Sequence, residues 1–129
     1  MNMKVSQKQI DSILVLPASQ RYKYFIKTIS DWQEVWGLYK EGWALAATEC
    51  GNTVFPLWPN KEFAEICAKN EWNGFIPKKF TIDELLDELL PNLNNDNVLP
   101  GIFYTPANKG VTPLIDELIN DISLELEKY

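Results

Sequence analysis

The side chains that could take part in chemistry in this 129-residue chain are two cysteines, eighteen carboxylates and twelve basic groups, and there is no histidine. Histidine is the commonest general base and metal ligand, so Ser-His and Cys-His nucleophile pairs are excluded. Two cysteines fall short of a four-ligand zinc site, and neither an EF-hand spacing nor a glycine-rich phosphate loop occurs. The sequence therefore predicts no catalytic residues, no cofactor and no metal site, and it favours a non-enzymatic role without excluding an enzyme.

The two cysteines differ in their expected surroundings. Cys50 stands beside Gly51 in a predicted turn, where an exposed thiol could act in redox or nucleophilic chemistry. No neighbour that would activate it is apparent, so an ordinary turn residue is the favoured interpretation. Cys67 lies on the apolar side of an expected helix and is interpreted as a core residue. We expect both thiols to be reduced.

Charge is distributed unevenly along the chain. The net charge is 12 − 18 = −6. Residues 1–30 contain five basic side chains and only Asp11 as an acid, giving +4 and leaving −10 for residues 31–129. An acidic surface repels phosphate backbones, so we expect no binding to nucleic acid. A basic protein partner would be attracted to it.

The acidic residues that could form a protein-binding surface lie on two expected helices. They are Asp83, Glu84, Asp87, Glu88, Asp116, Glu117 and Asp121. Charges on the outer side of an amphipathic helix are also the ordinary arrangement. The sequence leaves open whether these groups bind a partner or only face water.

The tryptophans are the second candidate for recognition. Four of the five, Trp32, Trp36, Trp43 and Trp58, fall in or beside residues 36–58. Large aromatic rings usually pack a small core. Trp58, between Pro56 and Pro59, is the exception, because prolines favour an edge strand and could leave this ring in a groove. We therefore include Trp58 among the possible protein-binding residues.

The elements that must position these groups follow from capping, spacing and turn signals. Helices are expected over residues 6–14, from residue 19, over 60–72, over 81–90 with Pro91 as the stop, and from 112 to the C-terminal region. Strands are expected over 34–39, 43–48, 53–58, 75–80 and 98–104, with a further ladder contact at Val111. The first three strands form a predicted meander, with 53–58 at its edge.

These elements predict one α+β domain over residues 1–129. A small antiparallel sheet with the Trp-rich meander is packed by about five short helices, in a single pair of layers. Residues 1–9 resemble no signal peptide, and no apolar run approaches the roughly 20 residues of a membrane helix. We expect a cytoplasmic protein that does not enter a membrane.

Several segments resemble the bacterial family catalogued as domain of unknown function 2750. They are Tyr22-Lys-Tyr-Phe, Trp36-Gly-Leu-Tyr, Gly42-Trp-Ala-Leu-Ala, Phe55-Pro-Leu-Trp-Pro59, Trp72-Asn-Gly-Phe-Ile-Pro77, Leu90-Pro and Phe103-Tyr-Thr-Pro106, followed by an acidic helix. The resemblance covers nearly the whole chain and implies a compact bacterial α+β domain. It implies no activity, cofactor or catalytic residue. The chain departs from the family's pattern after Asn92, where it is richer in asparagine.

The expected function is a non-enzymatic protein-binding module, an immunity or antitoxin-like protein whose acidic surface neutralises a basic toxin domain. The chain would act as a monomer or weak homodimer. A small-ligand binder or enzyme with a pocket lined by Trp36, Trp43, Trp58 and Trp72 is the first alternative. A regulatory or secretion-associated adaptor is the second, because Phe55-Pro-Leu-Trp before a helix resembles SseB-like domains.

Overall fold

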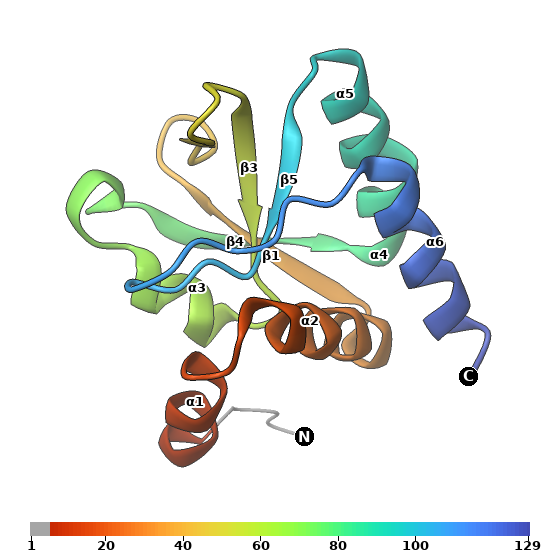
Figure 1. Cartoon of the computed structure of the whole chain (residues 1–129), viewed down its shortest axis with the longest axis horizontal. Helices are drawn as coiled ribbons and strands as arrows, with labels where there is room; N and C mark the ends of the chain where they lie inside the picture. Colours follow the sequence, from red (N-terminus) through yellow and green to blue (C-terminus); the bar gives the residue numbers. More distant parts are fainter. Residues whose placement is uncertain (1–5) are drawn as a thin grey trace.

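The computed structural model describes residues 6–129 and has an α+β fold, with helices around two small sheets (Figure 1). The helices are α1 (Gln7–Leu14), α2 (Ala18–Trp32), α3 (Lys61–Cys67), the 3₁₀ helix η1 (Asn70–Trp72), α4 (Ile82–Glu84), the π-helical η2 (Leu85–Leu89), α5 (Leu90–Asn95) and α6 (Ile115–Leu126). The strands are β1 (Glu34–Tyr39), β2 (Ala46–Ala47), β3 (Thr53–Leu57), β4 (Ile76–Thr81) and β5 (Leu99–Ile102). The α+β class expected from the sequence is confirmed.

The strands form a two-stranded and a three-stranded sheet. β1 pairs antiparallel with β4, so that Glu34 lies opposite Thr81. In the other sheet, β3 pairs antiparallel with β2 and parallel with β5. The two sheets are joined where Trp36 and Trp58 exchange backbone hydrogen bonds of 2.9 and 2.8 Å.

The predicted three-stranded meander is not confirmed. The chain turns back after β1 with a single bridge between Tyr39 and Trp43, and it does not continue as a ladder. The Trp43 ring instead crosses the sheet above Gly37, where an added Cβ would lie 3.0 Å from the ring, and stacks on Phe80 with centroids 4.7 Å apart. Phe80 belongs to β4, which is the strand that pairs with β1.

The predicted edge position of β3 is wrong, because β3 is the central strand of its sheet. Leu57 O accepts a hydrogen bond from Phe103 on the β5 side, whereas Trp58 bonds to Trp36 on the opposite side. Backbone N–H groups alternate in direction along a strand, so the nitrogen of Pro56 points to the same side as those of Val54 and Trp58. On that side Val54 pairs with Ala46 and Trp58 with Trp36, and Pro56 lies between these two pairings. The missing N–H of the proline is tolerated there.

One hydrophobic cluster extends from α1 to α6 and contains residues of both sheets. Phe25, Ile29, Val35, Leu57 and Leu118 in this cluster have 0% exposure. The cluster contains 25 buried hydrophobic residues. Since burying one large apolar side chain stabilises by roughly 1.5–3 kcal/mol, this cluster supplies most of the free energy that favours folding.

Helix boundaries follow the capping signals more closely than the proline signals. Ser6 Oγ accepts the N–H of Gln9 at the start of α1, and Thr81 and Glu84 form the predicted capping box. Pro91 does not end its helix, because the π-helical turn η2 precedes it and Pro91 occupies the first turn of α5, where an N–H is not needed.

Two other predicted caps differ from the structure. Asn60 stands at the N-cap position of α3, but its buried side chain makes no cap hydrogen bond. The last helix begins at Ile115 rather than after Thr112, because the carboxylate of Glu117 accepts the N–H of Leu114 at 3.2 Å. Leu114 precedes the helix and is 64% exposed.

Candidate functional site

A tightly held loop, residues 103–110, follows β5 and forms one wall of a pocket. Phe103 has a left-handed backbone with φ of 63°, which is unfavourable for an aromatic residue and turns the chain sharply out of the strand. At the other end of the loop, a Cβ at Gly110 would overlap the carbonyl oxygen of Ile102. A left-handed Phe103 and a close approach at Gly110 are therefore both needed to shape this loop.

Arg21 holds the 103–110 loop from inside the molecule. Its guanidinium donates to Phe103 O at 3.2 Å, to Lys109 O at 3.1 Å and to Leu16 O at 2.7 Å. The residue is only 2% exposed, and burial lowers the pKa of its guanidinium. Within residues 6–129, no carboxylate lies within 4.0 Å of it. Arg21 is therefore a buried cation that is stabilised by carbonyl dipoles and not by an ion pair.

The carbonyl oxygen of Tyr104 is a second anchor of the loop. It accepts hydrogen bonds from Trp58 Nε1 at 2.9 Å and from Cys67 Sγ at 3.3 Å. Trp58 is 0% exposed and packs edge-on against Trp72, with centroids 5.9 Å apart. The prediction that Trp58 lies in a surface groove is therefore wrong: its N–H is used inside the protein, and the ring is covered on all sides.

The Tyr104 pocket, as we call it, is a half-open hollow of about 440 Å³ between η1 and the 103–110 loop. Its floor consists of three residues that are 7–8% exposed, Cys67, Trp72 and Tyr104. Its rim is formed by exposed residues on both sides, among them Lys69 and Lys109. The hollow thus combines an apolar, partly aromatic floor with a charged rim.

Positive charge predominates around the Tyr104 pocket. Lys69 and Lys109 line it, with Glu71 as the one acidic lining residue. Burial raises the pKa of the Cys67 thiol to about 11, while the charges of Lys69 and Arg21 act on the thiol in the opposite direction. The Cys67 thiol is therefore protonated at neutral pH and is no nucleophile.

The expected pocket between four tryptophans does not form. Of Trp36, Trp43, Trp58 and Trp72, only Trp72 lines the Tyr104 pocket. The Trp43 ring lies in a separate cluster with Tyr39, Phe55 and Phe80. Trp58 and Trp72 pack against each other, whereas the Trp43 ring packs elsewhere, so the four rings do not line a common cavity.

Three of the seven acidic residues that the sequence singled out have structural partners. Glu84 accepts the N–H of Thr81 at 2.9 Å, and Glu117 caps α6 through Leu114. Asp121 accepts a 2.5 Å hydrogen bond from Tyr22 Oη in a groove between α2 and α6. Burial is the main cause that raises the pKa of Tyr22, and this hydrogen bond raises it further.

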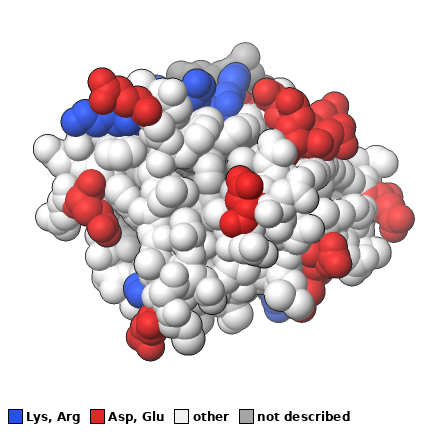
Figure 2. Space-filling view, turned by 90° about the horizontal axis from the view of Figure 1, so that it is seen from above, with Lys and Arg blue, Asp and Glu red and all other residues white. Residues whose placement is uncertain are grey.

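The other four form what we call the acidic face: Asp83, Asp87, Glu88 and Asp116. All four are exposed, and within the part of the chain that the structure describes none lies within 4.0 Å of a lysine or arginine nitrogen. Figure 1 places their helices on one side of the molecule, and Figure 2 shows the largest group of acidic atoms on the same half. A hollow of about 250 Å³, lined by Leu93, Leu99 and Leu114, lies where α5 meets α6.

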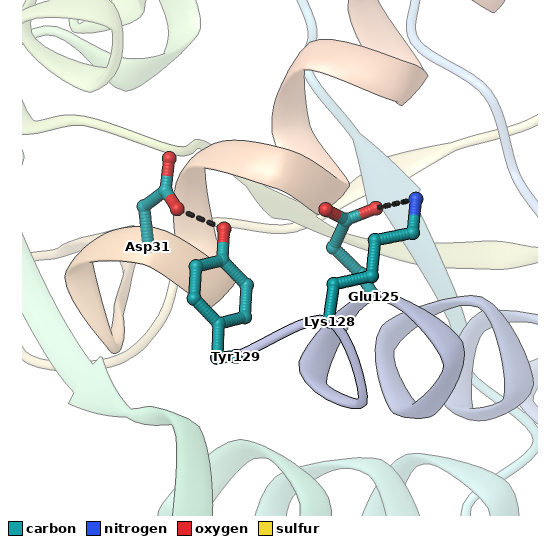
Figure 3. Close-up of polar contacts among 4 residues, drawn as sticks. All are labelled: Asp31, Glu125, Lys128 and Tyr129. Atoms are coloured by element: carbon teal, nitrogen blue, oxygen red, sulfur yellow. Dashed lines mark hydrogen bonds and ion pairs between the residues drawn. The ribbon is translucent and has the colours of Figure 1, made fainter.

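The C-terminal end of α6 has its own polar contacts (Figure 3). Lys128 and Glu125 form an ion pair of 3.2 Å, and the hydroxyl of Tyr129 donates to the Asp31 carboxylate at the end of α2. The contact between Tyr129 and Asp31 joins the end of α6 to α2, whereas the ion pair lies within the end of α6 itself. Glu125 is therefore not part of the acidic face.

Arg21, Lys69, Tyr104 and Lys109 were not singled out from the sequence. Charge alone would place Arg21 on the solvent side of α2 with Lys23 and Lys27. The spacing of Arg21 along the helix indicates its burial, because Arg21, Phe25 and Ile29 follow one another at intervals of four residues and lie on one buried side. No comparable signal marks Lys69, Tyr104 and Lys109, since the pocket depends on contacts between distant segments.

The structure shows no other site class within residues 6–129. Cys50 is exposed and Cys67 is buried, and neither is in a disulfide. No cluster of three metal-binding side chains occurs in this range. None of the described helices has the length and apolar character of a membrane-crossing segment.

Comparison with known proteins gives one relationship. The model of a family described as "Protein of unknown function (DUF2750)" matches residues 22–122. No curated protein and no solved structure matches the chain significantly. Three of the segments on which the family resemblance rests contribute Trp58, Trp72 and Tyr104 to the surroundings of the pocket. Because the matched range covers well over half of its length, the chain belongs to the DUF2750 family.

Proposed function

We propose that this protein is a non-enzymatic protein-binding module that uses its acidic face to bind a basic partner. The observation that carries the proposal is that Asp83, Asp87, Glu88 and Asp116 are exposed and have no cationic partner within the described chain. Carboxylates without intramolecular ion pairs are free to attract a basic surface, and charge complementarity of this kind raises the rate of association.

Apolar residues beside the acidic face support a protein partner. Leu114, two residues before Asp116, is 64% exposed and borders the hollow between α5 and α6, where Leu93 and Leu99 also lie. Protein interfaces combine an apolar centre with a polar rim. A basic partner would place an apolar side chain against Leu114 and its lysines or arginines against the surrounding carboxylates.

The partner class that fits this surface is a basic toxin domain, so that the protein acts in the cytoplasm as an immunity or antitoxin-like protein. Co-expression with the product of a neighbouring toxin gene tests this role. Wild-type protein should prevent growth arrest, and the purified pair should form a stable complex. A neighbouring gene product that is not toxic, or toxicity that persists despite soluble wild-type protein, contradicts it.

Charge reversal tests which surface is used. The acidic-face variant combines Asp83→Lys, Asp87→Lys and Glu88→Lys; its control combines Glu41→Lys, Glu49→Lys and Glu65→Lys, which are exposed at other places and change the net charge equally. We expect the acidic-face variant to bind the toxin domain at least about tenfold more weakly, equivalent to about 1.4 kcal/mol, and the control to bind within about twofold of wild type. Equal weakening in both variants contradicts the assignment.

A further inference from the structure

The Tyr104 pocket has the structure of a binding site for a small molecule, and nothing in the acidic face or its function involves it. Its volume of about 440 Å³ lies within the range of roughly 300–1,000 Å³ that is common for small-molecule sites. Its floor contains the buried rings of Trp72 and Tyr104, with centroids 6.2 Å apart. An aromatic floor of this kind offers an apolar surface to a flat ligand.

The charged residues around the pocket indicate which charge a ligand should carry. Lys69 lies on one rim and Lys109 on the other, and Lys109 Nζ lies 3.5 Å from Ala47 O on β2. Neither lysine has a carboxylate within 4.0 Å in residues 6–129. In a protein with a net charge of −6, the lining of this pocket carries two lysines against one carboxylate, Glu71. It attracts an anion.

Arg21 adds a third positive charge behind the wall. It binds the carbonyl oxygens of Phe103 and Lys109, so it lies directly under the loop that closes the pocket. A buried charge without a counter-ion is unfavourable, and in a medium of low polarity its field extends to neighbouring groups. An anion held by the two rim lysines would be stabilised by Arg21 as well, without contacting it.

The backbone of the pocket wall is held in an unfavourable conformation. Phe103 at the base of one wall and Asn70 in the other both have left-handed backbones, with φ of 63° and 53°; asparagine adopts this conformation readily, whereas an aromatic residue does not. For an aromatic residue this conformation costs roughly 1–2 kcal/mol, and such residues persist where the surroundings impose them, often at ligand sites. Because Arg21 and Gly110 fix the loop in this shape, the pocket exists before any ligand binds.

We infer that the Tyr104 pocket binds a small organic anion, a phosphate monoester or carboxylate attached to a flat apolar group. The anionic group lies between Lys69 and Lys109, and the flat group rests on Trp72 and Tyr104. The inference stands independently of the acidic face, which is formed by other elements. It involves no covalent step, so it assigns binding and not catalysis.

Titration of the ¹⁵N-labelled full chain by NMR tests this inference. The probes are phenyl phosphate, inorganic phosphate and the neutral compound benzamide. We expect saturable shifts with phenyl phosphate, concentrated in the amides of residues 67–72 and 104–109, at least about tenfold weaker binding of inorganic phosphate, and no saturation with benzamide. Equal affinity for phenyl phosphate and inorganic phosphate overturns the role of the aromatic floor, and shifts that do not concentrate in these residues overturn the site.

Two double variants distinguish the lysines of this pocket from exposed lysines elsewhere on the protein. Lys69→Ala with Lys109→Ala removes both rim charges, whereas Lys23→Ala with Lys27→Ala removes the same charge from the groove between α2 and α6. All four lysines are exposed, so both variants should keep the dispersed spectrum of the folded protein. We expect the first variant to bind phenyl phosphate at least about tenfold more weakly and the second within about twofold of wild type. The reverse result, or an equal loss in both, overturns the inference.

Discussion

The guanidinium of Arg21 donates a 3.2 Å hydrogen bond to the carbonyl oxygen of Phe103, 82 residues further along the chain. Phe103 is left-handed, and this bond together with those to Lys109 and Leu16 holds the turn at the end of β5. One side chain of α2 thus fixes the loop that walls the Tyr104 pocket.

Arg21→Met is expected to lower the free energy of unfolding by about 2–3 kcal/mol. Methionine fills a similar volume but leaves Phe103 O, in a buried contact, and Leu16 O and Lys109 O, in part-buried contacts, without this donor; a buried acceptor without a partner costs about 1–3 kcal/mol, and a part-buried one costs less. Lys27→Met on the exposed side of the same helix is the control, with an expected change within about 0.5 kcal/mol. Urea unfolding at pH 7 measures both. A loss below about 1 kcal/mol for Arg21→Met would show that these hydrogen bonds contribute little.

The two cysteines are expected to differ sharply in reactivity. Cys50 is exposed, whereas Cys67 is 7% exposed with its pKa raised to about 11 by burial. In the native protein at pH 8, a thiol reagent should therefore modify one thiol per chain rapidly, and in denaturant it should modify two. Cys50→Ser should abolish the rapid reaction. Rapid modification of two thiols in the folded wild type contradicts the burial of Cys67.

Stability should fall as pH rises from about 9 to 11. The folded protein keeps the Cys67 thiol protonated up to a pKa of about 11, whereas in the unfolded chain it ionises near 9. Over this interval the unfolded state binds fewer protons, so raising the pH favours unfolding, by at most about 2–3 kcal/mol from this thiol. The pKa values of Tyr22, Tyr24 and Tyr104 are also raised, mainly by burial, and act in the same direction.

The contribution of the thiol can be separated from that of the tyrosines. Urea midpoints of wild type and Cys67→Ala, compared at pH 8 and pH 10.5, should converge as pH rises, because the variant lacks the group whose ionisation destabilises the wild type. A constant difference between the two proteins would show that Cys67 has the same pKa in the folded and unfolded states.

Glu41→Gly is expected to stabilise the protein by about 0.5–1 kcal/mol. Glu41 is exposed and left-handed, with φ of 56°, in the turn after β1, and glycine adopts this conformation without the steric cost of a Cβ. Glu49→Gly removes an equally charged, exposed side chain from a turn position without positive φ and should be neutral or slightly destabilising. Thermal unfolding ranks the two variants, and the opposite ranking contradicts the assigned conformation.

Local signals in the sequence predicted the elements, and contacts between distant segments decided the rest. The cap at Ser6 and the capping box at Thr81 act within one turn, and both helix starts are confirmed. The pairing of β3 with β5 joins residues 45 positions apart, as Val54 and Leu99 show, and no local pattern specifies it. A proline in β3 indicated an edge, but only the positions of both neighbouring strands reveal why it is tolerated.

The pocket was beyond sequence reasoning for a similar reason. Trp58, Trp72 and Tyr104 come from three separate segments, and whether such rings form a core or a binding surface depends on which of them meet. Arg21 could have been found, since its spacing from Phe25 and Ile29 marks a buried position. Six of the seven acidic residues singled out for a protein-binding surface are exposed, but Glu84 and Glu117 also cap helices, which reduces the number of carboxylates without a partner.

Hydrogen exchange of the 103–110 loop tests most directly whether Arg21 fixes the pocket wall. The amides of Phe103, Thr105 and Asn108 donate to Leu57 O, Asn108 O and Thr105 Oγ1. In the wild type they should exchange at least about 100-fold more slowly than in an unfolded chain, because exchange requires local opening. In Arg21→Lys, which keeps the charge but not the three-way contact, protection of Thr105 and Asn108 should fall about tenfold or more while β1 and β4 amides stay protected. Unprotected loop amides in the wild type, or unchanged protection in Arg21→Lys, would contradict the role of Arg21.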